Sequence, residues 1–357
     1  MSDPLGRYLD GFTDRDWADG VDEPVRFALV GLGWWTQDHV LPALAASDAC
    51  EATALVTGTP EKADRLAAET PTVEATMTYE EYHDGAGAEA YDAVYVCTPN
   101  ATHLDLVETA ADLGNDVLCE KPMEASVDRA EALVAACRDA GVTLMIAYRM
   151  HTEPAVRRAR EFVRAGGVGD PLQVHGHMSD DILGFIDDPD QWRLDPDLSG
   201  GTTVNDVGIY PLNTARFVLD ADPVAVYGTT RAETEPFDGL DEHGAFQVEF
   251  PGTTAVCTAS HNAHQASHLT VLGTEGRVTV EPAFFPQQDR GLTVERGDAR
   301  ATFDFEQIDQ MQEEFDYFAA RVANDEPVDA DGEHGLVDMR AIEAIYESVE
   351  TGQRVEL

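Results

Sequence analysis

The sequence predicts an α/β protein of two domains, in which a doubly wound parallel sheet precedes an α+β domain with a mostly antiparallel sheet. Three observations support this prediction. The chain has 357 residues, more than one domain usually holds. Short apolar runs alternate with helical patterns up to about residue 149, and longer alternating runs follow. Hydrophobic residues make up 43% of the chain, enough to bury a substantial core.

The first domain is expected over residues 25–149, after an acidic arm over residues 1–24. Apolar runs ended by turn residues predict strands, and the stretches between them predict helices. The expected strands cover 25–30, 52–56, 93–97, 116–119 and 143–148. The expected helices run up to residue 44 and over 61–69, 102–113 and 126–140, the last one stopped by Gly141. This alternation with short turns indicates a parallel sheet.

The second domain is expected over residues 150–357. A helix over 154–164 leads into strands over 172–178, 224–231, 245–250, 254–260, 268–272 and 277–281. Two amphipathic helices close the chain, because apolar residues recur there every three or four positions. The first carries Ile308, Met311, Phe315, Phe318 and Val322, and the second Leu336, Met339, Ile342, Ile345 and Val349. Helices beside long alternating runs indicate an α+β domain.

The charge balance is extreme, because 68 acidic residues face 23 basic ones and the net charge is −45. The only lysines are Lys62 and Lys121. Such a surface offers no cationic stripe for phosphates, so neither nucleic acid nor an anionic membrane is an expected partner. Molar salt would screen the self-repulsion, so we expect adaptation to a salt-saturated cytoplasm. The alternative, an acidic protein of a mesophilic organism, fits the near-absence of lysine less well.

A cytoplasmic location is expected. The N-terminus lacks a basic region followed by an apolar one, so it does not resemble a signal peptide. No apolar run approaches the roughly 20 residues of a membrane span. The five cysteines show no CxxC spacing, which favours free thiols over disulfides or a zinc site.

Two groups of histidines are candidate metal ligands. His175 and His177 alternate on an expected strand, and His261, His264 and His268 flank an expected hairpin. No cysteine or clustered carboxylate completes a ligand set of the usual spacing. We therefore expect partly exposed histidines and no metal.

The glycines of Gly31-x-Gly33, between a strand and a helix, predict dinucleotide binding. The first glycine would allow a tight turn, and the second would let the backbone approach a pyrophosphate at the helix N-terminus. Trp34, Trp35 and Thr36 follow, and we expect all five residues to contact the cofactor. Thr36 stands where a third small residue is usual. The alternative is a glycine-rich turn without a ligand.

The end of the second strand favours NADP over NAD. The acid expected there to hold a ribose hydroxyl is absent, and Thr57 and Thr59 stand in the loop instead. Lys62 follows shortly. A neutral hydroxyl-bearing loop beside a cation suits a 2′-phosphate. The alternative is that Lys62 is a solvated charge at a helix start.

Lys121, Asp206 and Tyr210 are the candidate catalytic residues. Lys121 ends a strand at the carboxyl edge of the sheet, where ligands of such sheets bind. Asp206 and Tyr210 are four residues apart on an expected helix and would share a face. A phenol near an ammonium and a carboxylate could transfer protons. Taken alone, Asp206 and Tyr210 are better explained as a helix-start acid and a half-buried tyrosine.

The order of these motifs resembles the glucose–fructose oxidoreductase and inositol dehydrogenase (Gfo/Idh/MocA) family. The matching residues are Gly31-Leu32-Gly33, Thr98-Pro99-Asn100 with His103, Glu120-Lys121-Pro122, Trp192-Arg193, Gly200-Gly201 with Asp206 and Tyr210, and Gly273-Thr274-Glu275-Gly276. The resemblance covers nearly everything after residue 25. It implies a Rossmann domain and an open-faced antiparallel sheet that pairs subunits, hence a homo-oligomer, either a dimer or a tetramer.

The resemblance also implies roles for individual residues. Lys121 would be the essential lysine before a cis proline, Tyr210 the acid/base, and Asp206 the residue that orients a sugar. Further cofactor contacts would come from Thr98, Pro99, Asn100, His103, Glu120, Lys121, Trp192 and Arg193. Further substrate contacts would come from Tyr148, Arg149 and Asn205.

The implied reaction is NADP-dependent oxidation of an aldose at C1, with D-xylose giving D-xylonolactone. Tyr210 would accept the hydroxyl proton while the positive charge of Lys121 favours the phenolate. Two alternatives stay open. One is a dehydrogenase for another sugar, an inositol or a dihydrodiol, and the other is a non-catalytic regulator that binds dinucleotide.

Overall fold

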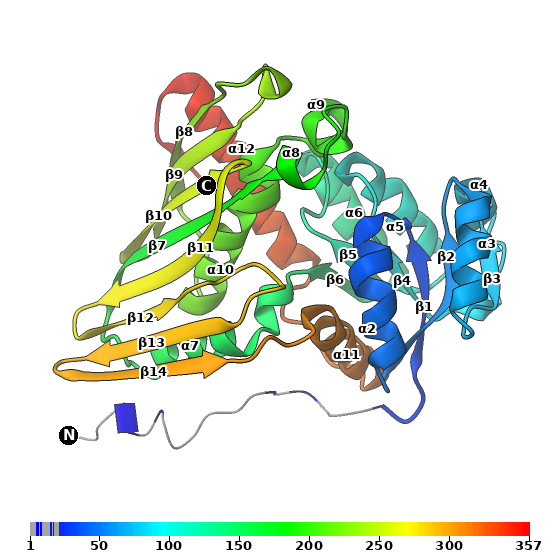
Figure 1. Ribbon diagram of the computed structural model, residues 1–357, viewed down its shortest axis with the longest axis horizontal. Coiled ribbons are helices and arrows are strands. Elements are labelled where there is room, and N and C mark those ends of the chain that lie inside the picture. The colour runs from blue at the N-terminus through cyan, green and yellow to red at the C-terminus, as the bar shows by residue number, and fades with distance from the viewer. Residues whose placement is uncertain (1–4, 7, 9–14, 16, 18–20) are drawn as a thin grey trace. The chain divides into compact units, whose positions relative to one another are not determined.

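The computed structural model describes residues 5, 6, 8, 15, 17 and 21–357 and divides the chain into two compact units (Figure 1). The parallel-sheet unit comprises Trp17–Arg149 and Asp309–Leu336. The mixed-sheet unit comprises Met1–Asp16, Met150–Ile308 and Val337–Leu357. Most of the expected arm over residues 1–24 lies outside the described residues.

The parallel-sheet unit has six strands in the order β3-β2-β1-β4-β5-β6, all parallel. The strands are β1 (Val25–Val30), β2 (Cys50–Val56), β3 (Ala75–Met77), β4 (Ala93–Val96), β5 (Asp116–Glu120) and β6 (Leu144–Ala147). This order confirms the expected Rossmann sheet. It reverses between β1 and β4, which is where such sheets bind ligands at their carboxyl ends.

Helices alternate with these strands, as the sequence predicted. They are η1 (Thr36–Val40), α2 (Leu41–Ala46), α3 (Pro60–Glu69), α4 (Tyr79–His83), η2 (Ala88–Ala90), η3 (Asn100–Thr102), α5 (His103–Asp112), α6 (Val127–Ala140) and η4 (Arg149–His151). A later helix, α11 (Gln310–Ala323), packs against α2 and β2. The strand β3 and the helix α4 are not predicted from the sequence, because they are too short to show a period.

The position of α11 corrects the expected domain assignment for residues 309–336. Phe315 and Phe318 on this helix lie with their rings 4.9 and 5.8 Å from the ring of Phe27 on β1. All three side chains are fully buried. The apolar stripe of α11 therefore covers the parallel sheet, although the sequence placed it in the second domain. The periodicity had revealed which face is apolar but not what it covers.

The mixed-sheet unit has nine strands in the order β14-β13-β12-β11-β7-β10-β9-β8-β15. The strands are β7 (Pro171–Asp181), β8 (Ala225–Arg231), β9 (His243–Phe250), β10 (Thr253–Ser260), β11 (Asn262–Gly273), β12 (Gly276–Val280), β13 (Arg290–Arg296), β14 (Ala299–Phe305) and β15 (Val355–Glu356). Only the β7–β10 pair is parallel. The expectation of a mostly antiparallel sheet is confirmed.

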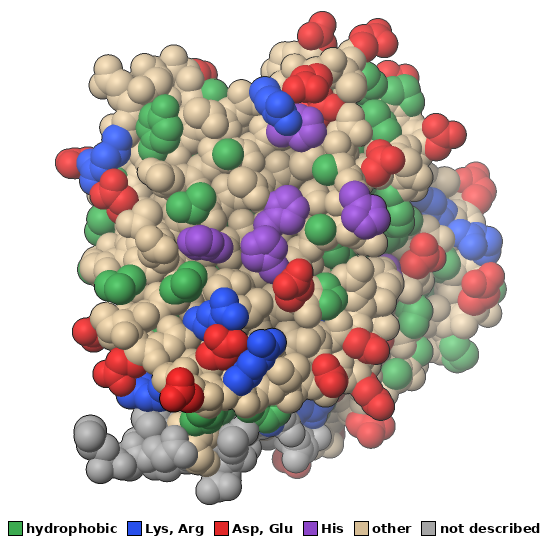
Figure 2. Space-filling model, turned by 60° about the vertical axis from the view of Figure 1, so that its left-hand side comes forward, with side chains coloured by type: hydrophobic (Ala, Val, Ile, Leu, Met, Phe, Trp, Pro, Cys, Tyr) green, Lys and Arg blue, Asp and Glu red, His purple; other side chains and the backbone are tan. Residues whose placement is uncertain are grey.

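The same unit contains helices and helical turns. They are α7 (Pro154–Arg164), α8 (Ile182–Phe185), η5 (Trp192–Leu194), α9 (Pro196–Ser199), η6 (Val204–Gly208), α10 (Ile209–Leu219), η7 (Glu235–Phe237) and α12 (Gly332–Thr351), which begins in the parallel-sheet unit. Buried and exposed residues alternate along β9 and β10, as expected of strands with one covered and one open face. The open face presents histidines near its middle, and most acidic side chains lie toward its edges (Figure 2).

All five cysteines are free thiols, and four of them are buried. Within residues 5, 6, 8, 15, 17 and 21–357, no helix has both the length and the apolar character to cross a membrane.

Candidate active site

The turn after β1 has the form of a pyrophosphate cradle. Gly31 has a φ of +98°, and a Cβ there would collide with the carbonyl oxygen of Cys97, so only glycine fits. Beside Gly33, a Cβ would meet no atom within 4 Å. The backbone at Gly33 is therefore open to a close approach by a ligand, and the following helix directs its N-terminus there.

Thr36 replaces the usual small residue without disturbing this turn. Its side chain is fully buried, and its hydroxyl donates to the carbonyl oxygen of Gly31 at 2.7 Å. It also begins the π-helical segment Thr36–Val40. Trp34 and Trp35 precede it with their rings edge to face, 5.4 Å apart. Because the buried hydroxyl of Thr36 is hydrogen-bonded within the turn, the turn accommodates a side chain larger than the usual small residue.

A cationic side chain lies over the same turn. Lys62 on α3 donates from Nζ to the carbonyl oxygen of Leu32 at 3.3 Å. Thr57 directly follows β2, and its hydroxyl accepts from the backbone N–H of Thr59 at 3.3 Å. Lys62 therefore stands where a phosphate on the second strand's side of a dinucleotide would need a positive charge.

Sequence reasoning missed a second cation on α3. Arg65 is one turn beyond Lys62, and its guanidinium donates to Oε1 of Gln37 at 3.0 Å. The three-residue spacing, which places both side chains on one face of α3, was the available signal.

His103 belongs to the scaffold of the site. The imidazole is fully buried, and its ring nitrogens lie 3.0 and 3.2 Å from the carbonyl oxygens of Thr98 and Met123. Burial lowers its pKa despite these contacts and the nearby carboxylates of Glu124 and Glu120. His103 thus connects the loop after β4, which holds Pro99 and Asn100, to the loop after β5. These contacts suit a positioning role, and direct contact of His103 with a cofactor stays a prediction.

Glu120 ends β5, Lys121 follows it directly, and the Lys121–Pro122 peptide bond is cis. Glu120 accepts from the hydroxyl of Tyr95 at 2.7 Å and from the backbone N–H of Lys121 at 3.1 Å. Glu314 on α11 is buried nearby, and burial together with the charge of Glu120 raises its pKa well above the usual range. The backbone at Lys121 is thus fixed by a carboxylate that is itself anchored.

Tyr148 and Arg149 follow β6 and are both buried. Arg149 donates to Oε1 of Gln310, and its guanidinium lies 5.8 Å from the ring centre of Trp35. The ring of Tyr148 lies 5.8 Å from that of His334. These contacts place both residues among the side chains of the parallel-sheet unit.

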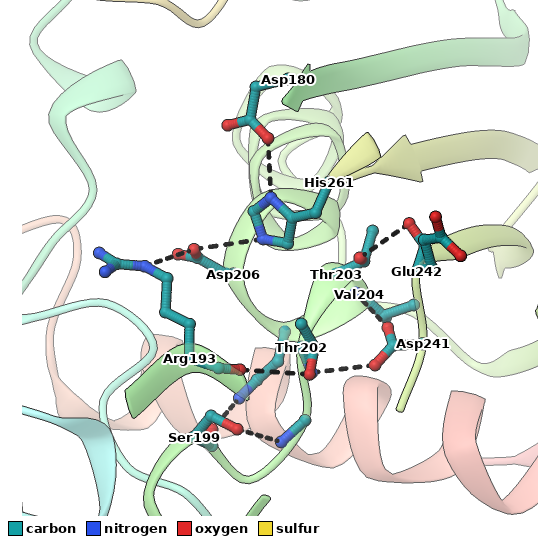
Figure 3. Close-up of polar contacts among 12 residues, drawn as sticks. Asp180, Arg193, Ser199, Thr202, Thr203, Val204, Asp206, Asp241, Glu242 and His261 are labelled. Atoms are coloured by element: carbon teal, nitrogen blue, oxygen red, sulfur yellow. Dashed lines mark hydrogen bonds and ion pairs between the residues drawn. The ribbon is translucent and has the colours of Figure 1, made fainter. Parts of the chain in front are cut away.

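In the mixed-sheet unit, Asp206 and Tyr210 lie on one continuous helix. Asp206 belongs to the π-helical segment η6, and Tyr210 to the first turn of α10. The buried carboxylate of Asp241 fixes the start of η6, because it accepts from the backbone N–H groups of Thr202 at 2.9 Å and Val204 at 2.6 Å (Figure 3). Segments of π-helix occur often at functional sites.

Two cationic side chains converge on Asp206. Nε of Arg193 lies 2.9 Å and Nε2 of His261 lies 3.3 Å from its Oδ2 atom (Figure 3). The guanidinium of Arg193 also lies 4.5 Å from the ring centre of Trp192. Arg193 therefore lies beside Asp206, the residue expected to orient the sugar. Asn205 is buried, and its Nδ2 donates to the carbonyl oxygen of Ser199 at 2.7 Å, which holds the turn before the helix.

The expectation of partly exposed histidines was wrong for His261. This residue is 1% exposed, and its Nδ1 lies 2.7 Å from Oδ1 of Asp180. Burial alone would lower its pKa, but Asp180 and Asp206 outweigh burial and raise it to about 9. His175, His177, His264 and His268 are exposed or half-buried. Across the described ranges, no group of three or more ligand-type side chains could hold a metal ion.

A Rossmann sheet with an open glycine turn, joined to a second sheet domain that carries acid and phenol groups, defines a dinucleotide-dependent oxidoreductase. Comparison with known families agrees. Residues 25–148 match the oxidoreductase family with an NAD-binding Rossmann fold, and residues 156–279 match the GFO/IDH/MocA C-terminal domain. The chain belongs to the Gfo/Idh/MocA family of oxidoreductases.

Its relatives include sugar dehydrogenases of salt-loving archaea. A D-xylose 1-dehydrogenase [NADP(+)] of Haloarcula marismortui is 58% identical over 97% of this chain and 98% of its own length. A D-xylose 1-dehydrogenase (NADP(+)) 2 of Haloferax volcanii is 36% identical over 93% and 99%. The crystal structure of an aldose-aldose oxidoreductase from Caulobacter crescentus with glycerol superposes with a TM-score of 0.88, at 32% identity over 94% of this chain and all of the other.

Proposed function

We propose that this chain oxidises D-xylose at C1 to D-xylonolactone with NADP as the hydride acceptor. The observation that carries the proposal is the 58% identity with the Haloarcula D-xylose 1-dehydrogenase [NADP(+)] over nearly the whole of both chains. The acidity of the chain and its two lysines suit the same high-salt setting.

The residues of the parallel-sheet unit fit a bound NADP. Gly31 would form the tight turn, and Gly33 would leave room for the pyrophosphate at the N-terminus of the helix that follows. Lys62 and the hydroxyls of Thr57 and Thr59 would hold the 2′-phosphate. When bound, the cofactor supplies the acceptor for the hydride that leaves C1 of the sugar.

Three side chains carry the proton chemistry and orient the sugar in this proposal. Tyr210 accepts the proton of the C1 hydroxyl as a general base, and Lys121 supplies a positive charge to the same step. Asp206 accepts hydrogen bonds from sugar hydroxyls, because Arg193 and His261 keep its carboxylate ionised and oriented.

An absorbance assay for NADPH formation in molar KCl tests this proposal. D-Xylose, D-glucose, L-arabinose and myo-inositol are supplied in turn, each with NADP and with NAD. We expect the largest kcat/KM for D-xylose with NADP. A larger kcat/KM for inositol would move the assignment to the alternative substrate class. Bound NADP without oxidation of any of these compounds would favour a regulator.

We further propose that the open face of the nine-stranded sheet pairs with a second copy of the chain. Two large apolar side chains are exposed on this face, at Tyr227 (39%) and Val256 (44%). The middle of the face carries few acidic side chains, although the chain has a net charge of −45 (Figure 2). A weakly charged, partly apolar face is what self-association requires of such an acidic molecule.

A further inference from the structure

Asp180, His261 and Asp206 form a chain of charged groups within the mixed-sheet unit (Figure 3). The imidazole of His261 lies between two carboxylates, with Nδ1 2.7 Å from Oδ1 of Asp180 and Nε2 3.3 Å from Oδ2 of Asp206. The side chain of His261 is fully buried, whereas those of Asp180 and Asp206 are 23% and 17% exposed. The histidine therefore lies deepest, and each carboxylate reaches toward solvent.

This geometry favours a doubly protonated imidazole. A neutral imidazole donates from one nitrogen only, so one of the two carboxylates would then face a lone pair. A protonated imidazole makes a charge-assisted hydrogen bond from Nδ1 to Asp180 and an ion pair through Nε2 with Asp206. The positive charge of the imidazole also offsets the repulsion between the two carboxylates on either side of the ring.

His261 is anchored more firmly than the other cation on Asp206. It lies between β10 and β11, where its backbone N–H donates to the carbonyl oxygen of Glu242 at 3.1 Å and its own carbonyl accepts from Ile182 at 3.0 Å. Arg193, in contrast, lies on the short turn η5. Because the backbone of His261 is held in this way, its side chain is a partner of fixed position for the carboxylate of Asp206.

We propose that His261, held by Asp180, is a positioning residue that fixes the carboxylate of Asp206 for binding the sugar. The inference rests on the proposed function, in which Asp206 orients the substrate. Neither Asp180 nor His261 reacts with the sugar. Asp180 acts by keeping the proton on His261, and His261 acts by holding one oxygen of Asp206.

The arrangement predicts a dependence on pH. Asp180 on β7 and Asp206 on η6 both contact the imidazole of His261, and Arg193 on η5 contacts Asp206. His261 stays protonated at neutral pH and loses its proton near pH 9. Above that pH, Asp206 keeps Arg193 but loses its fixed partner, so the KM for sugar should rise.

The test compares Asp180→Asn and His261→Gln with His83→Gln, which removes an exposed imidazole elsewhere in the chain. The measurements are kcat and KM for D-xylose from about pH 7 to about pH 10, the Kd for NADP, and the melting temperature. We expect Asp180→Asn to raise the sugar KM about tenfold at neutral pH, with kcat changed far less. Its alkaline rise in KM should begin at a lower pH than in the wild type. The Kd for NADP should not change.

His261→Gln should raise KM at neutral pH and lose the alkaline rise that the wild type shows. Folded variants with wild-type KM and an unchanged pH profile would overturn the inference. A purely structural role predicts a lower melting temperature with no movement of the pH profile, which would also overturn it. Failure of the proposed function is seen separately, because the wild-type chain itself would then oxidise no aldose.

Discussion

The hydroxyl of Thr36 donates a hydrogen bond to the carbonyl oxygen of Gly31, with 2.7 Å between the two oxygens. This bond joins the first turn of the helix to the end of β1 across the glycine turn. Because both groups are buried, neither has water as an alternative partner. The bond therefore sets the shape of the turn that would receive the pyrophosphate.

Thr36→Val keeps the shape of the side chain and removes the donor. We expect a loss of about 1 to 3 kcal/mol in the free energy of unfolding, because the carbonyl of Gly31 would stay buried without this bond. The KM for NADP should rise several-fold. Denaturant unfolding and cofactor titration measure the two effects. Thr36→Ser keeps the hydroxyl and serves as the control, and equal behaviour of the two variants would contradict this account.

Lys62→Gln should weaken NADP binding about tenfold and leave NAD binding unchanged, because only NADP carries the 2′-phosphate. Fluorescence titration with both cofactors measures the difference. Arg138→Gln makes the same charge change at a side chain that is 66% exposed, and it should alter neither affinity. If Lys62→Gln weakened the binding of NADP and NAD equally, Lys62 would support the glycine turn instead of binding the 2′-phosphate.

Lys121→Ala and Tyr210→Phe should each lower kcat by about three orders of magnitude with little effect on the fold. If the two residues act as one unit, the double variant should be no slower than the slower single variant. Steady-state assays of the three variants, with circular dichroism to verify folding, measure this coupling. Fully additive losses would mean that the two side chains serve separate steps, and near-normal turnover of Lys121→Ala would refute the scheme.

Val256→Glu should dissociate the proposed oligomer, because an interface would bury the new carboxylate without a partner. Light scattering in molar KCl measures the molar mass. Leu113→Glu is the matched control, since Leu113 is a similarly exposed apolar residue in the parallel-sheet unit. An unchanged mass for Val256→Glu, or a monomeric wild type, would exclude pairing through this face.

Protonated His261 should stabilise the fold in a defined range of pH. Its pKa rises from 6.5 in the unfolded chain to about 9 in the folded one, so the folded state holds the proton more tightly. The contribution is on the order of 3 kcal/mol below pH 6.5 and disappears as the pH rises through about 9. Denaturant unfolding across this range, with His261→Gln as reference, measures it. A constant difference between the two proteins would contradict the shift.

The sequence predicted those parts of the site that depend on local patterns. Gly31 and Gly33 follow an apolar strand directly, and Lys62 is conspicuous because the chain has only two lysines. The order of strands and helices up to residue 149 also follows from periodicity, because strands buried on both faces read as continuous apolar runs.

The contacts that the sequence did not reveal join distant residues. His261 and Asp180 are 81 positions apart, and no period or spacing links them. His103 was assigned to the cofactor because its motif position is visible, whereas its burial depends on the loop at Met123. β14 escaped detection because it is the edge strand of the sheet and none of its residues is buried, so its side chains show no apolar alternation.

The placement of α11 bears on how the chain folds during its synthesis. Phe27 leaves the ribosome early, but Phe315 and Phe318, which cover it, are made near the end of translation. The core of the parallel-sheet unit therefore stays incomplete until the whole nine-stranded sheet has been synthesised. A fragment ending at Arg149 would leave that apolar surface in water and should aggregate, so the two halves of this enzyme cannot be separated at the apparent domain boundary.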